Sequence, residues 1–263
     1  MSEELGVRAQ NFGLHAGIGI GFILDKARQV LEPGDAALLV LEYNFYAENR
    51  PTDVSVDTWF GCGDDYILAQ TPDAVFKAAA GLSMIKIFDR LAYNLVSDGQ
   101  GRQSIDHPDN PWSDKPLTDE EFSRKGAVPL ARLEGFGPID IQFGPNNSGV
   151  QAIRDFVAWS REAGVEVLAT WPNTIDFDVY DDAPAIDQIK AFYRNLGVSI
   201  VGEPDIALFP ASAFYDTQYH LDRPGIIKRT SLLAAAFKQN SAFRDWRSAS
   251  AKRPAVDGLQ IAP

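Results

Sequence analysis

The sequence has little cysteine, little positive charge and no long apolar run. Its single cysteine, Cys62, cannot form a disulfide within the chain, and a structural thiol is the simplest interpretation. The 24 basic residues are outnumbered by 36 acidic ones, so the formal charge is −12 and a nucleic-acid backbone would be repelled. No stretch approaches the roughly 18 consecutive apolar residues of a membrane span. We therefore expect neither a nucleic-acid partner nor a membrane span for this chain.

Length and composition favour one enlarged globular domain. The 263 residues are 45% hydrophobic and 11% aromatic, which is typical of a globular protein with a well-buried core. We expect a single domain over 1–240 with an insertion at about 47–143. Part of that insertion is rich in Gly, Asp, Pro and Ser, and both a binding loop and a surface segment without a chemical role fit it. The polar, aperiodic end predicts a loosely ordered tail over 241–263.

Alternating helices and strands predict an α/β fold. The apolar run AALLVL at 36–41 is typical of a parallel strand that helices cover on both faces. A further strand is expected near Val7, ahead of the first helix. The other predicted helices and strands follow from apolar residues at helical spacing, good N-cap residues and terminal glycines. The predicted helices lie at about 19–31, 147–164, 186–197 and 222–240, and the predicted strands at 36–41, 165–170 and 198–201. Such alternation is typical of a doubly wound parallel sheet.

Three polar clusters come directly after apolar runs, where open α/β sheets place their sites. They are 11–17 (NFGLHAG), 42–46 (EYNFY) and 216–221 (DTQYHL). His220 follows an aromatic-rich segment and precedes a capped helix, where an imidazole can serve as a general base. An acid a few residues away can hold its tautomer. The alternative is a histidine that only bonds a backbone carbonyl.

The three clusters resemble the ordered sequence blocks of SGNH (GDSL-type) hydrolases, and most closely those of the bacterial DltD- and AlgJ-like branch. The similarity extends over roughly the whole chain. In that family a glycine and an asparagine donate hydrogen bonds to the oxyanion, while an Asp and a His near the C-terminus activate a serine. The resemblance implies these roles for Gly13, Asn44, Asp216 and His220.

The resemblance also implies a fold, a ligand class and a binding surface. The fold would be a three-layer α/β/α arrangement around a mostly parallel, flavodoxin-like sheet. The activity would be that of a serine esterase or O-acyltransferase on an acyl ester, carried by a small molecule or a polysaccharide, without cofactor or metal. The expected substrate-binding residues are Asn11, His15, Tyr43, Trp171 and Tyr219, although His15 fits a turn role equally well.

Two departures from the family pattern bear on catalysis. Three residues, 217–219, separate Asp216 from His220, where the family has two. The family's nucleophilic serine precedes the glycine block, and here only ten residues precede Asn11, without a strand and Gly-x-Ser turn. We therefore expect this chain to lack the nucleophile segment and to be inactive as it stands. Either an upstream segment supplies it, together with any export signal or membrane anchor, or the protein is a catalytically inactive carbohydrate-binding or assembly protein. The compartment stays open.

Overall fold

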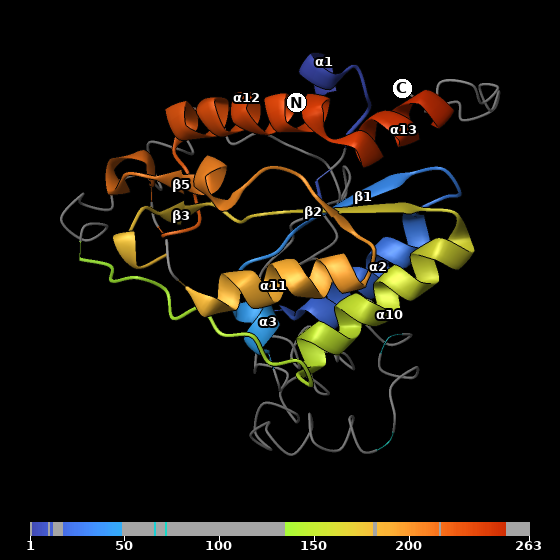
Figure 1. Ribbon diagram of the computed structural model, residues 1–263, viewed down its shortest axis with the longest axis horizontal. Helices are drawn as coiled ribbons and strands as arrows, with labels where there is room; N and C mark the ends of the chain where they lie inside the picture. The colour runs from blue at the N-terminus through green and yellow to red at the C-terminus, as the bar shows by residue number, and fades with distance from the viewer. Residues whose placement is uncertain are drawn as a thin grey trace, which may run out of the picture.

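The computed structural model describes residues 2–9, 11–12, 18–48, 66, 72, 135–180, 183–215 and 217–250. Within these residues the chain forms an α/β fold whose ladders are parallel (Figure 1). The helices are α1 (Ser2–Leu5), α2 (Ile20–Val30), α3 (Asn44–Ala47), α10 (Ser148–Ala163), α11 (Pro184–Asn195), α12 (Arg223–Gln239) and α13 (Ser241–Ser250), with short 3-10 turns η3 (Asp178–Tyr180), η4 (Pro204–Ala207) and η5 (Ala211–Ala213). The strands are β1 (Ala36–Val40), β2 (Glu166–Thr170), β3 (Thr174–Ile175), β4 (Ser199–Ile200) and β5 (Leu208–Phe209).

The main sheet has the strand order β1-β2-β4, and β3 and β5 form a second, smaller parallel pair. The β1–β2 ladder runs from Ala36 opposite Glu166 to Val40 opposite Thr170. On its other side β2 pairs with β4, where Leu168 lies opposite Ser199. Because these strands are parallel, the segments that leave β1, β2 and β4 all begin at the same edge of the sheet, here called the carboxyl edge.

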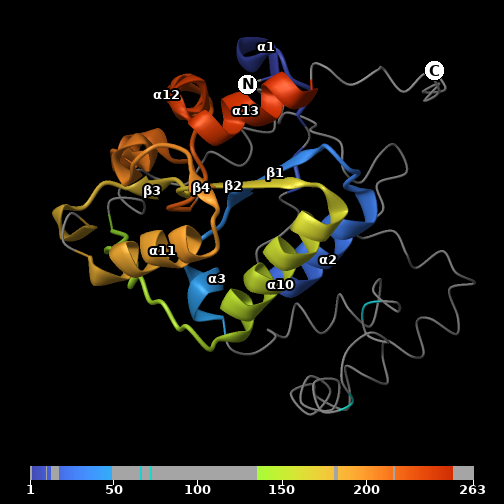
Figure 2. The same cartoon turned by 45° about the vertical axis from the view of Figure 1, so that its right-hand side comes forward.

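Helices cover both faces of this sheet (Figure 2). Successive side chains of a strand point to opposite faces, and β2 shows this directly. Val167 and Ala169 belong to the core that α2, α10 and α11 complete. Leu168 belongs to a second core with residues of α12 and α13. This two-sided burial explains why the strand sequence is almost continuously apolar.

The structure confirms most of the elements expected from the sequence, and it confirms the local signals at their ends. Helix α10 stops at Gly164, whose left-handed conformation at φ 71° places its N–H near the last helical carbonyls. Helix α12 begins after Asp222, whose Oδ1 accepts a hydrogen bond of 2.8 Å from the Gly225 N–H. Pro224 occupies the first turn, where its missing N–H costs nothing.

Two expectations at the ends of the chain are wrong. No strand forms around Val7, because that residue follows helix α1 and packs against the α12–α13 core. The predicted loose tail is wrong for residues 241–250, which form α13. The Phe243 side chain is only 4% exposed, with its ring centre 4.6 Å from that of Phe237. The Trp246 Nε1 donates a hydrogen bond of 2.8 Å to the Gly34 carbonyl, so the helix is fixed to the turn before β1.

Most of the expected insertion at 47–143 lies outside the described residues, as do the last residues, 251–263. Over the part of the chain that the structure describes, no helix combines the length and the apolar character that crossing a bilayer requires.

Candidate functional site

Two of the polar clusters meet at the carboxyl edge. Tyr43 comes three residues after β1 ends, and Tyr219 lies just before α12. The Tyr219 phenol lies close to the backbone of Tyr43, and both side chains lie near the phenol of Tyr180. Segments that are far apart in the sequence thus form one local structure beyond the end of β1.

The three phenols are neutral hydrogen-bonding groups rather than charges. Burial raises the pKa of Tyr43, Tyr180 and Tyr219, and the nearby Glu42 carboxylate adds to the increase at Tyr219. The Tyr180 hydroxyl accepts a hydrogen bond from the backbone N–H of Ile139. At neutral pH this part of the edge can therefore donate hydrogen bonds to the oxygens of an uncharged ligand.

A buried cation lies beneath the same edge. The Arg229 side chain on α12 is 6% exposed. It donates hydrogen bonds of 2.8 Å to the Trp171 carbonyl and 3.1 Å to the Ile206 carbonyl, and a longer one of 3.5 Å to Thr170 Oγ1. Loss of solvation lowers its pKa to about 10, while Tyr43 favours the charged form, so the guanidinium stays charged at neutral pH. Among the described residues it makes no ion pair with a carboxylate.

The imidazole of His220 lies on the surface of a closed loop. An antiparallel bridge joins Phe214 to Leu221, and the Tyr215 N–H donates to the His220 carbonyl at 3.1 Å. Leu221 is buried, which anchors the end of the loop, whereas His220 is exposed. Its ring stacks on that of Tyr215 with 5.7 Å between centres and 21° between planes. The stacking restricts the imidazole without removing it from solvent.

Asn44 begins helix α3 and is also exposed, since its neighbours Phe45 and Tyr46 take the buried positions. The Tyr46 hydroxyl pairs with that of Tyr193 at 2.7 Å, which ties α3 to α11 in the core. Asn44 and His220 each follow, in the sequence, one of the two tyrosines that meet here, and both are exposed.

The remaining expected site residues fall into two groups. Asn11 is exposed, and Trp171 is buried with its carbonyl bonded to Arg229. Gly13, His15 and Asp216 lie outside the described residues.

The buried Arg229 and Tyr180 at this edge were not found from the sequence. The buried atoms Asn173 Oδ1, Thr174 Oγ1 and Gln218 Oε1 also lie here without a hydrogen-bond partner in the described part of the chain, as do Arg28 Nε and Ser250 Oγ elsewhere. Buried polar atoms without a partner are uncommon, and they are expected where a ligand or water binds. The sequence signal for these buried groups was the pair of polar residues at 173–174, which begins three residues after the end of the apolar strand β2.

The described site offers neutral donors, a buried cation and an exposed imidazole. No grouping of three or more His, Cys, Asp or Glu side chains suited to a metal ion occurs among the described residues. Comparisons of the chain with models of protein families, with curated proteins and with solved structures find no match. What the protein does must therefore be inferred from the chemistry of these residues.

Proposed function

We propose that this chain carries the histidine and oxyanion-binding part of an SGNH-type ester-cleaving or acyl-transferring site. One contact carries the proposal: the Tyr219 phenol lies close to the Tyr43 backbone. It joins the segment that contains His220 to the segment that contains Asn44. The parallel strands β1, β2 and β4 fit three neighbouring strands of a flavodoxin-like sheet, which is part of the same proposal.

In the proposed mechanism a serine hydroxyl attacks the acyl carbonyl, and the His220 imidazole accepts the hydroxyl proton. Asp216 holds the imidazole in the required tautomer. The Gly13 N–H and the Asn44 carboxamide donate hydrogen bonds to the oxyanion of the tetrahedral intermediate. When the intermediate collapses, the ester C–O bond breaks, the leaving alcohol takes the proton from His220, and the acyl group stays on the serine until water or an acceptor hydroxyl removes it. No serine of this chain is assigned as the nucleophile.

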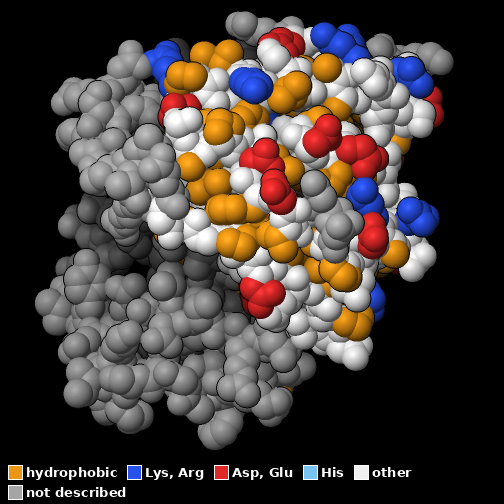
Figure 3. Space-filling model, turned by 60° about the vertical axis from the view of Figure 1, so that its left-hand side comes forward, with side chains coloured by type: hydrophobic (Ala, Val, Ile, Leu, Met, Phe, Trp, Pro, Cys, Tyr) orange, Lys and Arg blue, Asp and Glu red, His pale blue; other side chains and the backbone are white. Residues whose placement is uncertain are grey.

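The surface favours an uncharged ester over a polyanion. Figure 3 shows acidic side chains among apolar ones across the middle of the described face that it presents, with Lys and Arg toward the upper and right margins. The formal charge of −12 works in the same direction, because it disfavours the approach of an anion. An acetylated small molecule or an O-acetylated neutral polysaccharide fits this surface together with the neutral phenols of the site.

The proposal is tested by comparing an acetylated oligosaccharide with its deacetylated form. Because the acyl group adds hydrogen bonds that the parent sugar lacks, we expect the acetylated form to bind about tenfold more tightly in calorimetry. Asn44→Ala and His220→Ala should reduce this difference. Asn195→Ala is the matched control, because Asn195 is an exposed asparagine at the opposite, amino edge of the sheet.

Equal affinity for both forms would contradict the ester proposal and favour a carbohydrate-binding protein. Absence of binding to either form would contradict both functions. Acetate release, followed in the same samples, addresses the nucleophile. Release that His220→Ala abolishes would place a nucleophile within this chain, against the expectation that the chain alone is inactive.

A further inference from the structure

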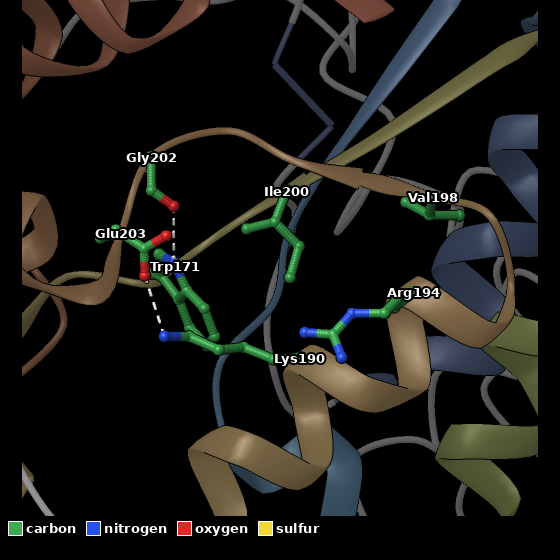
Figure 4. Close-up of a pocket in the computed structure, with 7 residues that line it drawn as sticks. All are labelled: Trp171, Lys190, Arg194, Val198, Ile200, Gly202 and Glu203. Carbon is green, nitrogen blue, oxygen red and sulfur yellow. Dashed lines mark hydrogen bonds and ion pairs between the residues drawn. The ribbon is translucent and has the colours of Figure 1, made fainter.

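A pocket of about 260 Å³ lies between helix α11 and strand β4, which is the outer strand of the described sheet (Figure 4). Its volume is near the lower end of the range for small-molecule sites, which is about 300 Å³. The pocket is separate from the loop that carries His220, since none of the residues 214–221 lines it.

Largely buried apolar side chains form the inner wall of the pocket. Val198 directly precedes β4 and Ile200 ends it, and both side chains pack in the same core cluster. The Trp171 indole forms one end, and its Nε1 donates a hydrogen bond of 3.0 Å to the Gly202 carbonyl. Gly202 has a left-handed φ of 78°, and a Cβ there would collide with the side chain of Ile206. The turn that positions the indole therefore requires glycine.

The outer rim carries two cations and one acid. Lys190 and Arg194 are four residues apart on α11, so they lie on the same side of the helix. Lys190 Nζ is 2.9 Å from Glu203 Oε2 and 5.9 Å from the centre of the Trp171 ring, so its charge is already paired. Within the described part of the chain, the Arg194 guanidinium makes no hydrogen bond or ion pair, and Figure 4 shows it directed into the pocket.

The positive charge at this rim is not cancelled by the end of the helix. The carbonyls at a helix C-terminus carry partial negative charge, and Arg194 lies in the last turn of α11. The guanidinium of Arg161 donates to the Leu196 carbonyl just beyond that turn. This contact offsets the dipole and leaves Arg194 available as a forked donor, the geometry that matches a carboxylate or phosphate group.

We propose that this pocket binds a small organic anion, in which a carboxylate or phosphate group is joined to a compact apolar body. The anionic head pairs with Arg194, and the apolar body packs on the half-buried Ile200, backed by the buried side chains of Val198 and Trp171. Glu203 limits the affinity, because it occupies Lys190 and repels the ligand. The site does not depend on the ester-cleaving function proposed above.

Three probes with one ring and different heads test the proposal: benzoate, phenyl phosphate and benzamide. Binding is followed by the NMR signal of the Trp171 indole N–H, assigned from its loss in Trp171→Phe. We expect at least one anionic probe to shift this signal and to bind about fivefold or more tightly than benzamide, because charged hydrogen bonds are the stronger kind. Comparing the affinities of benzoate and phenyl phosphate then shows whether the pocket prefers a carboxylate or a phosphate group. Equal binding of benzamide, or no shift with any probe, would overturn the proposal.

Two variants of the pocket should change the affinity for the anion in opposite directions, whereas damage to the fold would weaken binding in both. Arg194→Gln should weaken binding of the anion about fivefold, whereas Glu203→Gln should strengthen it about twofold by releasing Lys190. Arg244→Gln, on the exposed side of α13, is the matched control and should change neither. If Arg194→Gln and Arg244→Gln weakened binding of the anion equally, the effect would come from the general surface charge, and the proposed site would be rejected. His220→Ala should leave binding unchanged, so failure of the ester proposal and failure of this one are distinguishable.

Discussion

Replacing Arg229 by methionine should lower the free energy of unfolding by about 2–4 kcal/mol. Arg229 is 6% exposed and donates hydrogen bonds to the carbonyls of Trp171 and Ile206 at 2.8 and 3.1 Å. Methionine fills a similar space but donates nothing, so two acceptors lose their partner at about 1–3 kcal/mol each. The substitution also removes the cost of burying a charge, which offsets part of that loss.

The measurement is urea unfolding followed by circular dichroism at neutral pH, with Arg229→Lys as the control. Lysine keeps the charge, but its single nitrogen lacks the planar fork with which the guanidinium holds the Trp171 and Ile206 carbonyls at once. We expect its stability to lie between those of the wild type and Arg229→Met. A methionine variant within about 1 kcal/mol of the wild type would refute the reasoning. If lysine were the worse substitution, desolvation of the charge and not the lost hydrogen bonds would dominate.

Three further predictions use buried groups. Phe243→Ala should cost about 3–5 kcal/mol in urea unfolding, because its ring is 4% exposed among other aromatic rings; a loss below 1 kcal/mol would mean that α13 is not docked. Burial raises the pKa of Glu48, whose Oε2 accepts a hydrogen bond from the Ile20 N–H at 3.3 Å, so the folded state loses stability as pH rises and the carboxyl ionises. Glu48→Gln should therefore raise the free energy of unfolding at pH 7 but not at pH 4. Burial raises the pKa values of Tyr43 and Tyr219 above the ordinary value of 10.0, so the folded state should lose stability as pH rises beyond about 10. In a pH titration, the absorbance of tyrosinate should then appear over the same pH range in which the circular dichroism signal is lost.

The helices and strands that could be predicted from the sequence are those whose pattern depends on neighbouring residues alone. The run of apolar residues identified β1 and β2, because a strand buried on both faces leaves no polar position to interrupt it. Gly164 and Asp222 marked the end of α10 and the start of α12 through backbone geometry and capping, which depend on neighbouring residues only. Helix α13 was missed because its three apolar contacts, Ala242, Phe243 and Trp246, lie in an otherwise polar segment.

The sequence predicted two of the segments that meet at the candidate site, but not its buried cation. Strand ends gave the clusters at 42–46 and 216–221, and the contact between Tyr43 and Tyr219 brings these two together. Arg229 could not be predicted, because a basic residue within a helix is usually exposed, and its burial depends on carbonyls that lie far away in the sequence. Arg229 also interrupts the row of apolar residues on α12, so the helical spacing of apolar residues that indicates a buried face is weak in this helix.

The two edges of the sheet differ in the groups that they bury. At the amino edge, backbone groups satisfy one another: the Gly34 N–H donates to the Gly164 carbonyl at 2.7 Å, and the Glu166 N–H to the Asp35 carbonyl at 2.9 Å. At the carboxyl edge, the fold buries the Arg229 cation together with neutral phenols and polar atoms such as Thr174 Oγ1. The position of these groups at the edge where α/β sheets bind ligands agrees with the ligand site proposed above.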